Sequence, residues 1–146
     1  MWTGSDLWQA ARFNDLDEIA RLAATPGAEL NLQDARGYSP LMLAVYAGQK
    51  EASELLISLG SDTNSADFGG NSILMGASFK GHLDLVKLLL EQGADPHARN
   101  TSGMTAFDFA VTFGRTDVAN FLSERTGVKE RKSRLWGLIK ILFSMR

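Results

Sequence analysis

Few side chains of this 146-residue chain could carry out chemistry. It contains two histidines, His82 and His97, and no cysteine, which excludes disulfides, thiolate nucleophiles and zinc sites built on cysteine. His97 lies in the turn-like sequence Asp95-Pro96-His97, which we interpret as a surface loop, with a metal or haem ligand as the alternative. Because two histidines without cysteine form a poor metal-binding set, we expect no metal site and no cofactor.

Hydrolytic and phosphoryl-transfer chemistry is also poorly supported. The serines, histidines and aspartates form no recognisable catalytic triad. The sequence Gly69-Gly70-Asn71-Ser72 is rich in glycine, but it lacks the lysine of a phosphate-binding loop. Asp15, Asp17 and Glu18 fit a solvated helix surface or the start of a helix, where negative charge is favourable. We therefore expect that the protein is not an enzyme.

Aromatic residues, in contrast, recur at a fixed interval. Phe13, Tyr46 and Phe79 are spaced 33 residues apart. The same step separates two sets of glycines, Gly37, Gly70 and Gly103, and Gly48, Gly81 and Gly114. Such a period indicates stacked structural repeats, which commonly form a binding surface. The clear units are residues 34–66, 67–99 and 100 to about 126, and a degenerate unit precedes them.

Each unit predicts a turn followed by two helices. A turn-forming side chain stands three residues before a glycine in every clear unit: Asp34, Asp67 and Asn100. A hydroxyl residue that can cap a first helix follows: Ser39, Ser72 and Thr105. Pro40 fits the first turn of such a helix, and Gly48, Gly81 and Gly114 are expected to end it. A second, leucine-rich helix follows, and two helices this short bury their apolar sides only by stacking on neighbouring units.

With these features, the chain resembles the ankyrin repeat family. Residues 34–44 (DARGYSPLMLA) match the family pattern D-x-x-G-x-T-P-L-H-x-A, and residues 81–95 (GHLDLVKLLLEQGAD) match its G-H, second helix and G-A-D. The resemblance covers about residues 4–127. It implies an all-α solenoid of about four stacked helix-turn-helix repeats (about 1–33, 34–66, 67–99 and 100–127), followed by an extra C-terminal helix in residues 128–146. His82 then occupies the structural G-H position of the family.

The chain departs from the family pattern at several helix positions. The hydrogen-bonding histidine of the family is replaced by Met42, Met75 and Asp108, so we expect that polar bond between repeats to be lost or altered. Gly76 lies inside a predicted helix, where glycine costs about 1 kcal/mol relative to alanine. Because Ile73 also replaces the helix-start proline, we expect the middle repeat to be soft.

The resemblance also implies a concave surface, formed by the turn tips and one side of each first helix, where the family usually binds proteins. We predict partner-binding residues at Phe13, Arg36, Tyr38, Tyr46, Phe68, Asn71, Phe79, Lys80, Met104 and Phe113. The 33-residue step aligns Phe13 with Tyr46 and Phe79, and rings surplus to a leucine and alanine core favour an interface hot spot. The alternative is that the rings pack on one another. Arg36, Lys80 and Arg99 would form a cationic rim that favours an acidic partner.

Charge divides the chain into two parts. Residues 1–127 carry nine basic and sixteen acidic side chains, a net charge of −7, whereas residues 128–146 carry a net charge of +5. An acidic repeat region argues against nucleic acid binding, which requires a basic surface. Residues 1–10 show no secretory signal, and no stretch approaches the ~20 apolar residues that span a bilayer. We expect a cytoplasmic protein, with membrane association through the tail as an option.

The tail, residues 128–146, breaks the repeat. Taken as a helix, it is basic and broadly apolar, with membrane or cap residues at Arg131, Lys132, Arg134, Leu135, Trp136, Ile139, Leu142 and Phe143. Three roles stay open: capping the last repeat, contact with an anionic membrane surface, and dimerisation. The sequence thus predicts a non-catalytic protein–protein interaction module. The alternatives are a membrane-peripheral adaptor anchored by the tail, or an inhibitor or accessory factor of a neighbouring enzyme.

Overall fold

The computed structural model describes residues 5–129, and within this range it forms eight helices in four pairs. The helices are α1 (Ser5–Arg12), α2 (Leu16–Ala23), α3 (Pro40–Tyr46), α4 (Lys50–Ser58), α5 (Ile73–Lys80), α6 (Leu83–Glu91), α7 (Ala106–Thr112) and α8 (Thr116–Thr126). An isolated bridge between Ala66 and Ser72 is the one β interaction in the described range. The predicted all-α fold of stacked helix pairs is confirmed.

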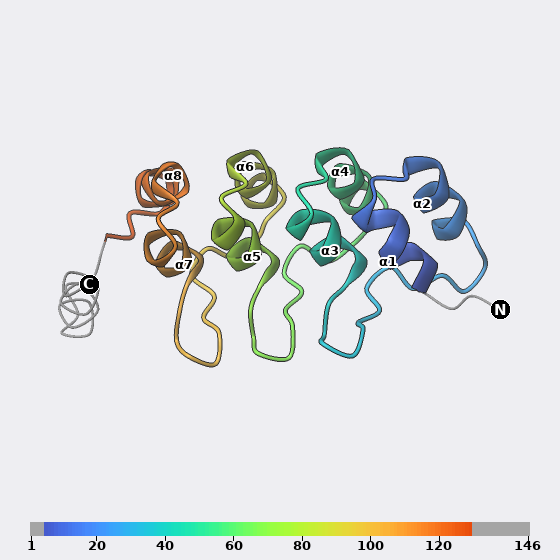
Figure 1. Ribbon diagram of the computed structural model, residues 1–146, viewed down its shortest axis with the longest axis horizontal. Helices are drawn as coiled ribbons and strands as arrows, with labels where there is room; N and C mark the ends of the chain where they lie inside the picture. The colour runs from blue at the N-terminus through green and yellow to red at the C-terminus, as the bar shows by residue number, and fades with distance from the viewer. Residues whose placement is uncertain (1–4, 130–146) are drawn as a thin grey trace, which may run out of the picture.

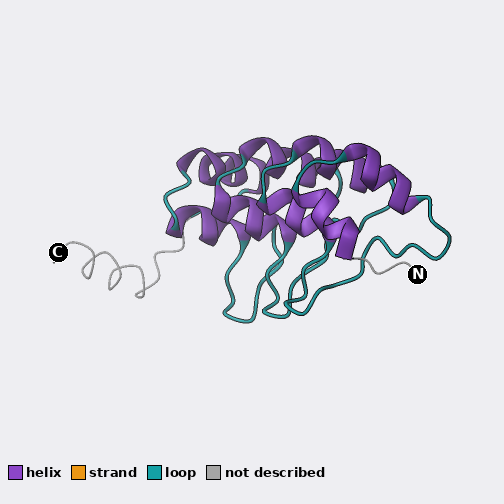
Figure 2. Cartoon of the chain, turned by 45° about the vertical axis from the view of Figure 1, so that its right-hand side comes forward, coloured by secondary structure: helices purple, strands orange, loops and turns teal. Residues whose placement is uncertain are grey.

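The helices form two layers, as Figure 1 shows. The first helix of each pair (α1, α3, α5 and α7) lies in one layer and the second (α2, α4, α6 and α8) in the other. Three long loops extend away from the first layer on the same side of the molecule (Figures 1 and 2). The apolar core lies between the layers and is continuous from Leu7 to Leu122. Stacking therefore buries the apolar side that each helix pair could not bury alone.

The caps of the first helices follow the sequence prediction. The side chains of Ser39, Ser72 and Thr105 each accept a hydrogen bond from the backbone N–H three residues ahead. Pro40 occupies the first turn of α3, where its missing N–H has no intrahelical partner to lose. These caps fix where each first helix begins.

The loop tips are held by side-chain-to-backbone bonds. Asp34 Oδ1 accepts from the N–H groups of Arg36 and Tyr38, at 2.8 and 2.9 Å, and Asp67 and Asn100 make the equivalent pair of bonds. Gly37, at φ +85°, is the position where the chain turns, and a Cβ there would lie 2.6 Å from the backbone nitrogen of Phe68 in the next tip. The glycine is required both by the turn and by the close stacking of the tips.

The three replacements of the family histidine have different consequences. Met42 and Met75 are each 1% exposed and belong to the apolar core. Asp108 instead folds back on its own helix start, where its Oδ2 accepts from the N–H (2.9 Å) and the hydroxyl (3.1 Å) of Thr105. Asp108 therefore completes a capping box, an arrangement that satisfies two donors at the start of α7.

Adjacent repeats are joined by a recurring hydrogen bond. The residue before each second helix reaches back to a carbonyl at the end of the preceding first helix: Gln49 to Arg12 (3.1 Å), His82 to Tyr46 (3.4 Å) and Arg115 to Phe79 (2.9 Å). His82 thus has the structural role that the sequence predicted. His97 lies exposed in a loop, where its N–H donates to Asp95 at 2.8 Å.

Candidate functional site

The candidate site lies on what we call the loop-side face: the exposed surface of α1, α3, α5 and α7 together with the loop tips at residues 34–38, 67–71 and 100–104. Figures 1 and 2 show that these elements lie on the same side of the second-layer helices. All ten residues predicted to bind a partner belong to these elements or to the turns directly after them. The structure divides eight of them into three groups and leaves Phe13 and Phe68 outside these groups.

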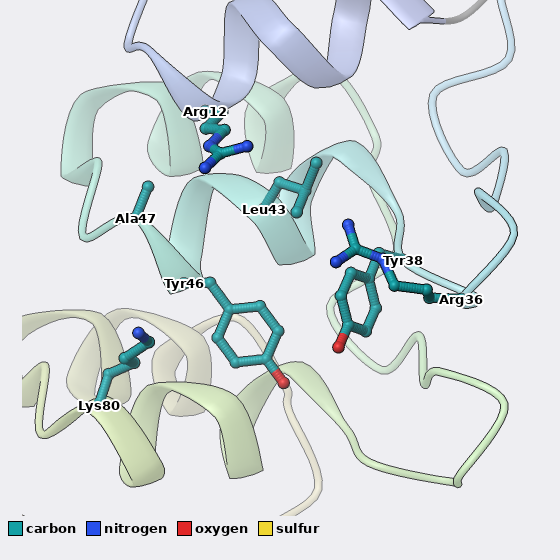
Figure 3. A pocket seen from close by; sticks show the side chains of 7 residues that line it. All are labelled: Arg12, Arg36, Tyr38, Leu43, Tyr46, Ala47 and Lys80. Atoms are coloured by element: carbon teal, nitrogen blue, oxygen red, sulfur yellow. The ribbon is translucent and has the colours of Figure 1, made fainter.

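The first group lines a hollow of about 410 Å³ between the first-layer helices and the first loop tip. Its walls are formed by Arg12, Arg36, Tyr38, Leu43, Tyr46, Ala47 and Lys80 (Figure 3). Four of these were predicted from the sequence: Arg36, Tyr38, Tyr46 and Lys80. Arg12, Leu43 and Ala47 were not.

Arg12 was missed because the prediction aligned the first repeat one residue out of step. The N–H of Asp15 bonds to the carbonyl of Ala10, and the equivalent bond runs from Gln49 to Ala44, a step of 34 residues. After the second helices the 33-residue step is kept, because the N–H of Asp62 bonds to Asn31 Oδ1 and the N–H of Asp95 bonds to Asn64 Oδ1. The first repeat therefore contains one extra residue between α2 and Asn31.

This shift corrects the predicted alignment of Phe13 with Tyr46 and Phe79. The carbonyls that accept the bond between repeats belong to Arg12, Tyr46 and Phe79, so Arg12 is the structural counterpart of Tyr46. Phe13 corresponds to Ala47 and Lys80, and its alignment with Tyr46 was wrong. The signal that could have shown it was Asn14, which adopts φ +59° and ends α1 as Gly48 ends α3.

Two tyrosines form the apolar wall of the hollow. The rings of Tyr38 and Tyr46 meet edge to face with their centroids 5.6 Å apart, and both pack against the core. The prediction that the aromatic rings are surplus to the core is therefore wrong for these two. Trp8 Nε1 donates to the carbonyl of Tyr38 at 2.8 Å and so attaches the first loop tip to α1.

Gly76 explains how the Tyr46 ring reaches its position. A Cβ added at Gly76 would lie 2.4 Å from Cε1 and 2.8 Å from Cζ of that ring. The absence of a side chain at Gly76 therefore leaves room for the ring, which extends from α3 and packs against α5 (Figure 3). Burial raises the pKa of Tyr46 to about 12, with added repulsion from Tyr38 and Asp67.

Arg36 is held in place at the rim of the hollow. Its guanidinium lies over the ring of Tyr38, 4.4 Å from the centroid, and its Nη2 is 3.3 Å from Asp34 Oδ2. Burial of Asp34 opposes its ionisation, but the N–H groups of Tyr38 and Arg36 and the guanidinium hold its pKa below the usual range. Arg36 thus presents a charged group in a fixed orientation.

The second group is a separate aromatic cluster at the other end of the face. The rings of Phe79 and Phe113 meet edge to face at 4.6 Å, and Phe109 stacks on Phe113 at 6.1 Å. Phe109 is a member of this cluster that was not among the residues predicted from the sequence. Phe13 and Phe68 stand apart from both clusters and are 69% and 68% exposed.

The third group is held by bonds within the loops. Asn71 donates to Asp67 Oδ2 at 3.1 Å and accepts from Asn100 Nδ2 at 2.8 Å. Met104 is half-buried. Arg99, expected in the cationic rim, donates to the carbonyl of Gly103 at 2.8 Å. The side chains of Asn71 and Arg99 therefore stabilise the tips.

Other predictions fall outside this face. The tail residues from Arg131 to Phe143 lie outside the described residues. Within residues 5–129, no group of three histidine or acidic side chains is arranged to hold a metal ion. No helix in the same range is long and apolar enough to cross a membrane.

Comparison with known proteins identifies the family. The family model described as "Ankyrin repeats (3 copies)" matches residues 7–100, which is more than half of the chain. The search of curated proteins found no significant match. The matched range runs from within α1 to the start of the third loop tip and includes every residue that lines the hollow, so the chain belongs to the ankyrin repeat family.

Proposed function

We propose that this protein is a non-catalytic interaction module that binds a protein partner through its loop-side face. Ankyrin repeats generally mediate protein–protein interaction. The observation that supports this face is the distribution of exposed aromatic side chains. Within residues 5–129 the exposed phenylalanines are Phe13, Phe68 and Phe113: Phe68 lies on the second loop tip, and Phe13 and Phe113 lie in the turns directly after the first-layer helices α1 and α7.

Phe13 and Phe68 are the best candidates for anchoring residues. Each leaves about two thirds of its surface in contact with water, and neither ring pairs with another ring in the described part of the chain. Exposed aromatic rings are enriched among the residues that contribute most to protein–protein affinity. Burial of both rings by a partner would supply a large apolar contact.

The face is also well ordered for binding. The three bonds from Gln49, His82 and Arg115 join neighbouring repeats, and the tips bond to each other through Phe68 N–H to Arg36 and Thr101 N–H to Gly69. A surface that is fixed before binding loses little conformational entropy on association. This supports recognition by a preformed surface.

The test compares partner recovery by matched variants of the full chain. Phe13→Ser and Phe68→Ser remove exposed rings without touching the core, and Leu59→Ser removes an apolar side chain, 40% exposed, at the end of α4 in the second layer. In quantitative affinity purification, proteins that depend on this face should be recovered less by the two phenylalanine variants and equally by Leu59→Ser. Equal recovery by all three variants would refute the proposal.

A further inference from the structure

The hollow beside these rings has a charge that differs from the rest of the repeat region. The second-layer helices α2, α4, α6 and α8 carry eight acidic and four basic side chains. The first-layer helices carry only two of each, and their basic residues, Arg12 and Lys80, both line the hollow. Arg36 adds a third cation from the loop tip.

These cations have few acidic partners. Within residues 5–129 two ion pairs form, Arg21 with Glu18 on α2 and Arg36 with Asp34. Arg12 and Lys80 instead lie 5.8 Å from the ring centroids of Phe13 and Phe79. With Asp34 counted against Arg36, and with Asp67 included because its charge acts on Tyr46, the hollow has a local charge of about +1 in a region whose net charge is −7.

The lining of the hollow also suits the shape of an acidic side chain. Tyr46, Leu43 and Ala47 provide an apolar wall for an aliphatic stem, and the cations surround it (Figure 3). The planar guanidinium of Arg36, already oriented by Tyr38 and Asp34, matches the planar geometry of a carboxylate. Phe68 lies beside this rim, because its N–H donates to the carbonyl of Arg36 at 3.3 Å, and its exposed ring offers an apolar surface to the same peptide.

We propose that the hollow lined by Arg12, Arg36 and Lys80 is an anchor subsite that binds a glutamate or aspartate side chain of an acidic, partly apolar peptide segment in the partner. The inference rests on the proposed function and specifies the chemistry of what is bound. Nucleic acid is disfavoured because three cations are set in an acidic region, whereas phosphate backbones require an extended basic surface. The chain's own residues 128–146 are disfavoured because their net charge of +5 has the same sign as the hollow.

The test measures binding of two labelled peptides to the full chain by fluorescence anisotropy. The first peptide contains alternating Glu and Leu residues separated by Gly. The second peptide has the same sequence with every Glu replaced by Gln. We expect the Glu peptide to bind at least about tenfold more tightly, because charged hydrogen bonds are stronger than neutral ones. Equal affinity for the two peptides, or no detectable binding of the Glu peptide, would overturn the anchor subsite.

Matched variants locate the effect. The double substitution Arg12→Gln with Lys80→Gln should weaken binding of the Glu peptide about tenfold or more. Lys50→Gln with Lys87→Gln changes the net charge equally, but on α4 and α6, and should change affinity less than about twofold. Replacing Arg131, Lys132 and Arg134 by Gln should leave the difference between the two peptides intact. An equal loss in both double variants, or loss only in the tail variant, would assign binding to net charge or to the tail and refute the inference.

Two further experiments distinguish the carboxylate subsite from a phosphate subsite and from the proposed function. A phosphoserine version of the peptide that bound more tightly than the Glu version, with the same dependence on Arg12 and Lys80, would show that the subsite is built for phosphate and that the carboxylate assignment is wrong. The phenylalanine variants of the partner-recovery experiment report on the face itself. If those variants lose the partner while the Arg12 and Lys80 variants retain it, the proposed function stands and the anchor subsite fails.

Discussion

Replacing Gly76 by alanine tests how the hollow is built. By helix propensity alone, alanine in the middle of α5 should stabilise the protein by about 1 kcal/mol. The structure predicts the opposite, because the new methyl group would lie 2.4 Å from the ring of Tyr46. The Tyr46 ring would have to move away from α5.

The magnitude follows from what the ring would lose. Tyr46 packs against the core and meets Tyr38 edge to face, so displacement forfeits an aromatic pair worth about 0.5–1.5 kcal/mol together with part of the buried area. Forcing an extra methyl group into a packed site costs about 1–3 kcal/mol in general. After the gain in helix propensity is subtracted, we expect Gly76→Ala to destabilise the fold by about 1 kcal/mol.

A double-mutant cycle isolates the contact. Urea unfolding of the wild type, Gly76→Ala, Tyr46→Ala and the double variant gives four free energies of unfolding. In the Tyr46→Ala background the methyl group has no ring to displace, so Gly76→Ala should stabilise by about 0.5–1 kcal/mol. If Gly76→Ala stabilises both backgrounds equally, then Tyr46 does not rest on Gly76 and the reasoning is refuted.

Three more perturbations address other parts of the fold. Because folding raises the pKa of Tyr46 to about 12, the contribution of its neutral hydroxyl to stability is complete below about pH 10 and is lost as the pH rises from about 10 to 12. The free energy of unfolding should therefore fall more steeply over this pH range for the wild type than for Tyr46→Phe. Equal slopes for the two proteins would contradict this. Asn14→Gly keeps the left-handed turn but removes the 2.9 Å bond from the N–H of Ala52 to Asn14 Oδ1, so it should cost about 1 kcal/mol, and Asn14→Ala should cost more in the same denaturation assay because of its backbone strain. Removing residues 128–146 should lower the melting temperature, since Val128 already packs against the core and the rest of this segment is rich in apolar residues; an unchanged melting temperature together with tail-dependent flotation on anionic vesicles would favour the membrane role instead.

Much of the fold could be predicted because local chemistry determines it. Ser39, Ser72 and Thr105 cap the first helices, and Asp34, Asp67 and Asn100 form the turns, through bonds to residues at most four positions away. Interactions of this kind are encoded in the spacing of residue types. The 33-residue period then places the repeats.

The site could be predicted only in part, because it depends on contacts between repeats. One extra residue between α2 and Asn31 shifted the first repeat, so Phe13 was placed where Arg12 lies. The glycine at position 76 suggested softness, whereas its role is to seat a ring that comes from α3. Neither fact follows from the sequence of a single repeat.

The central claim is that a protein partner binds the loop-side face. It is tested most directly by placing a photo-crosslinking amino acid in turn at Phe68, on the second loop tip, and at Leu59, in the second layer. Irradiation of the full chain with its partner should give a crosslinked product from position 68 and little from position 59. Crosslinking from position 59 alone would place the interface on the opposite layer and contradict the claim.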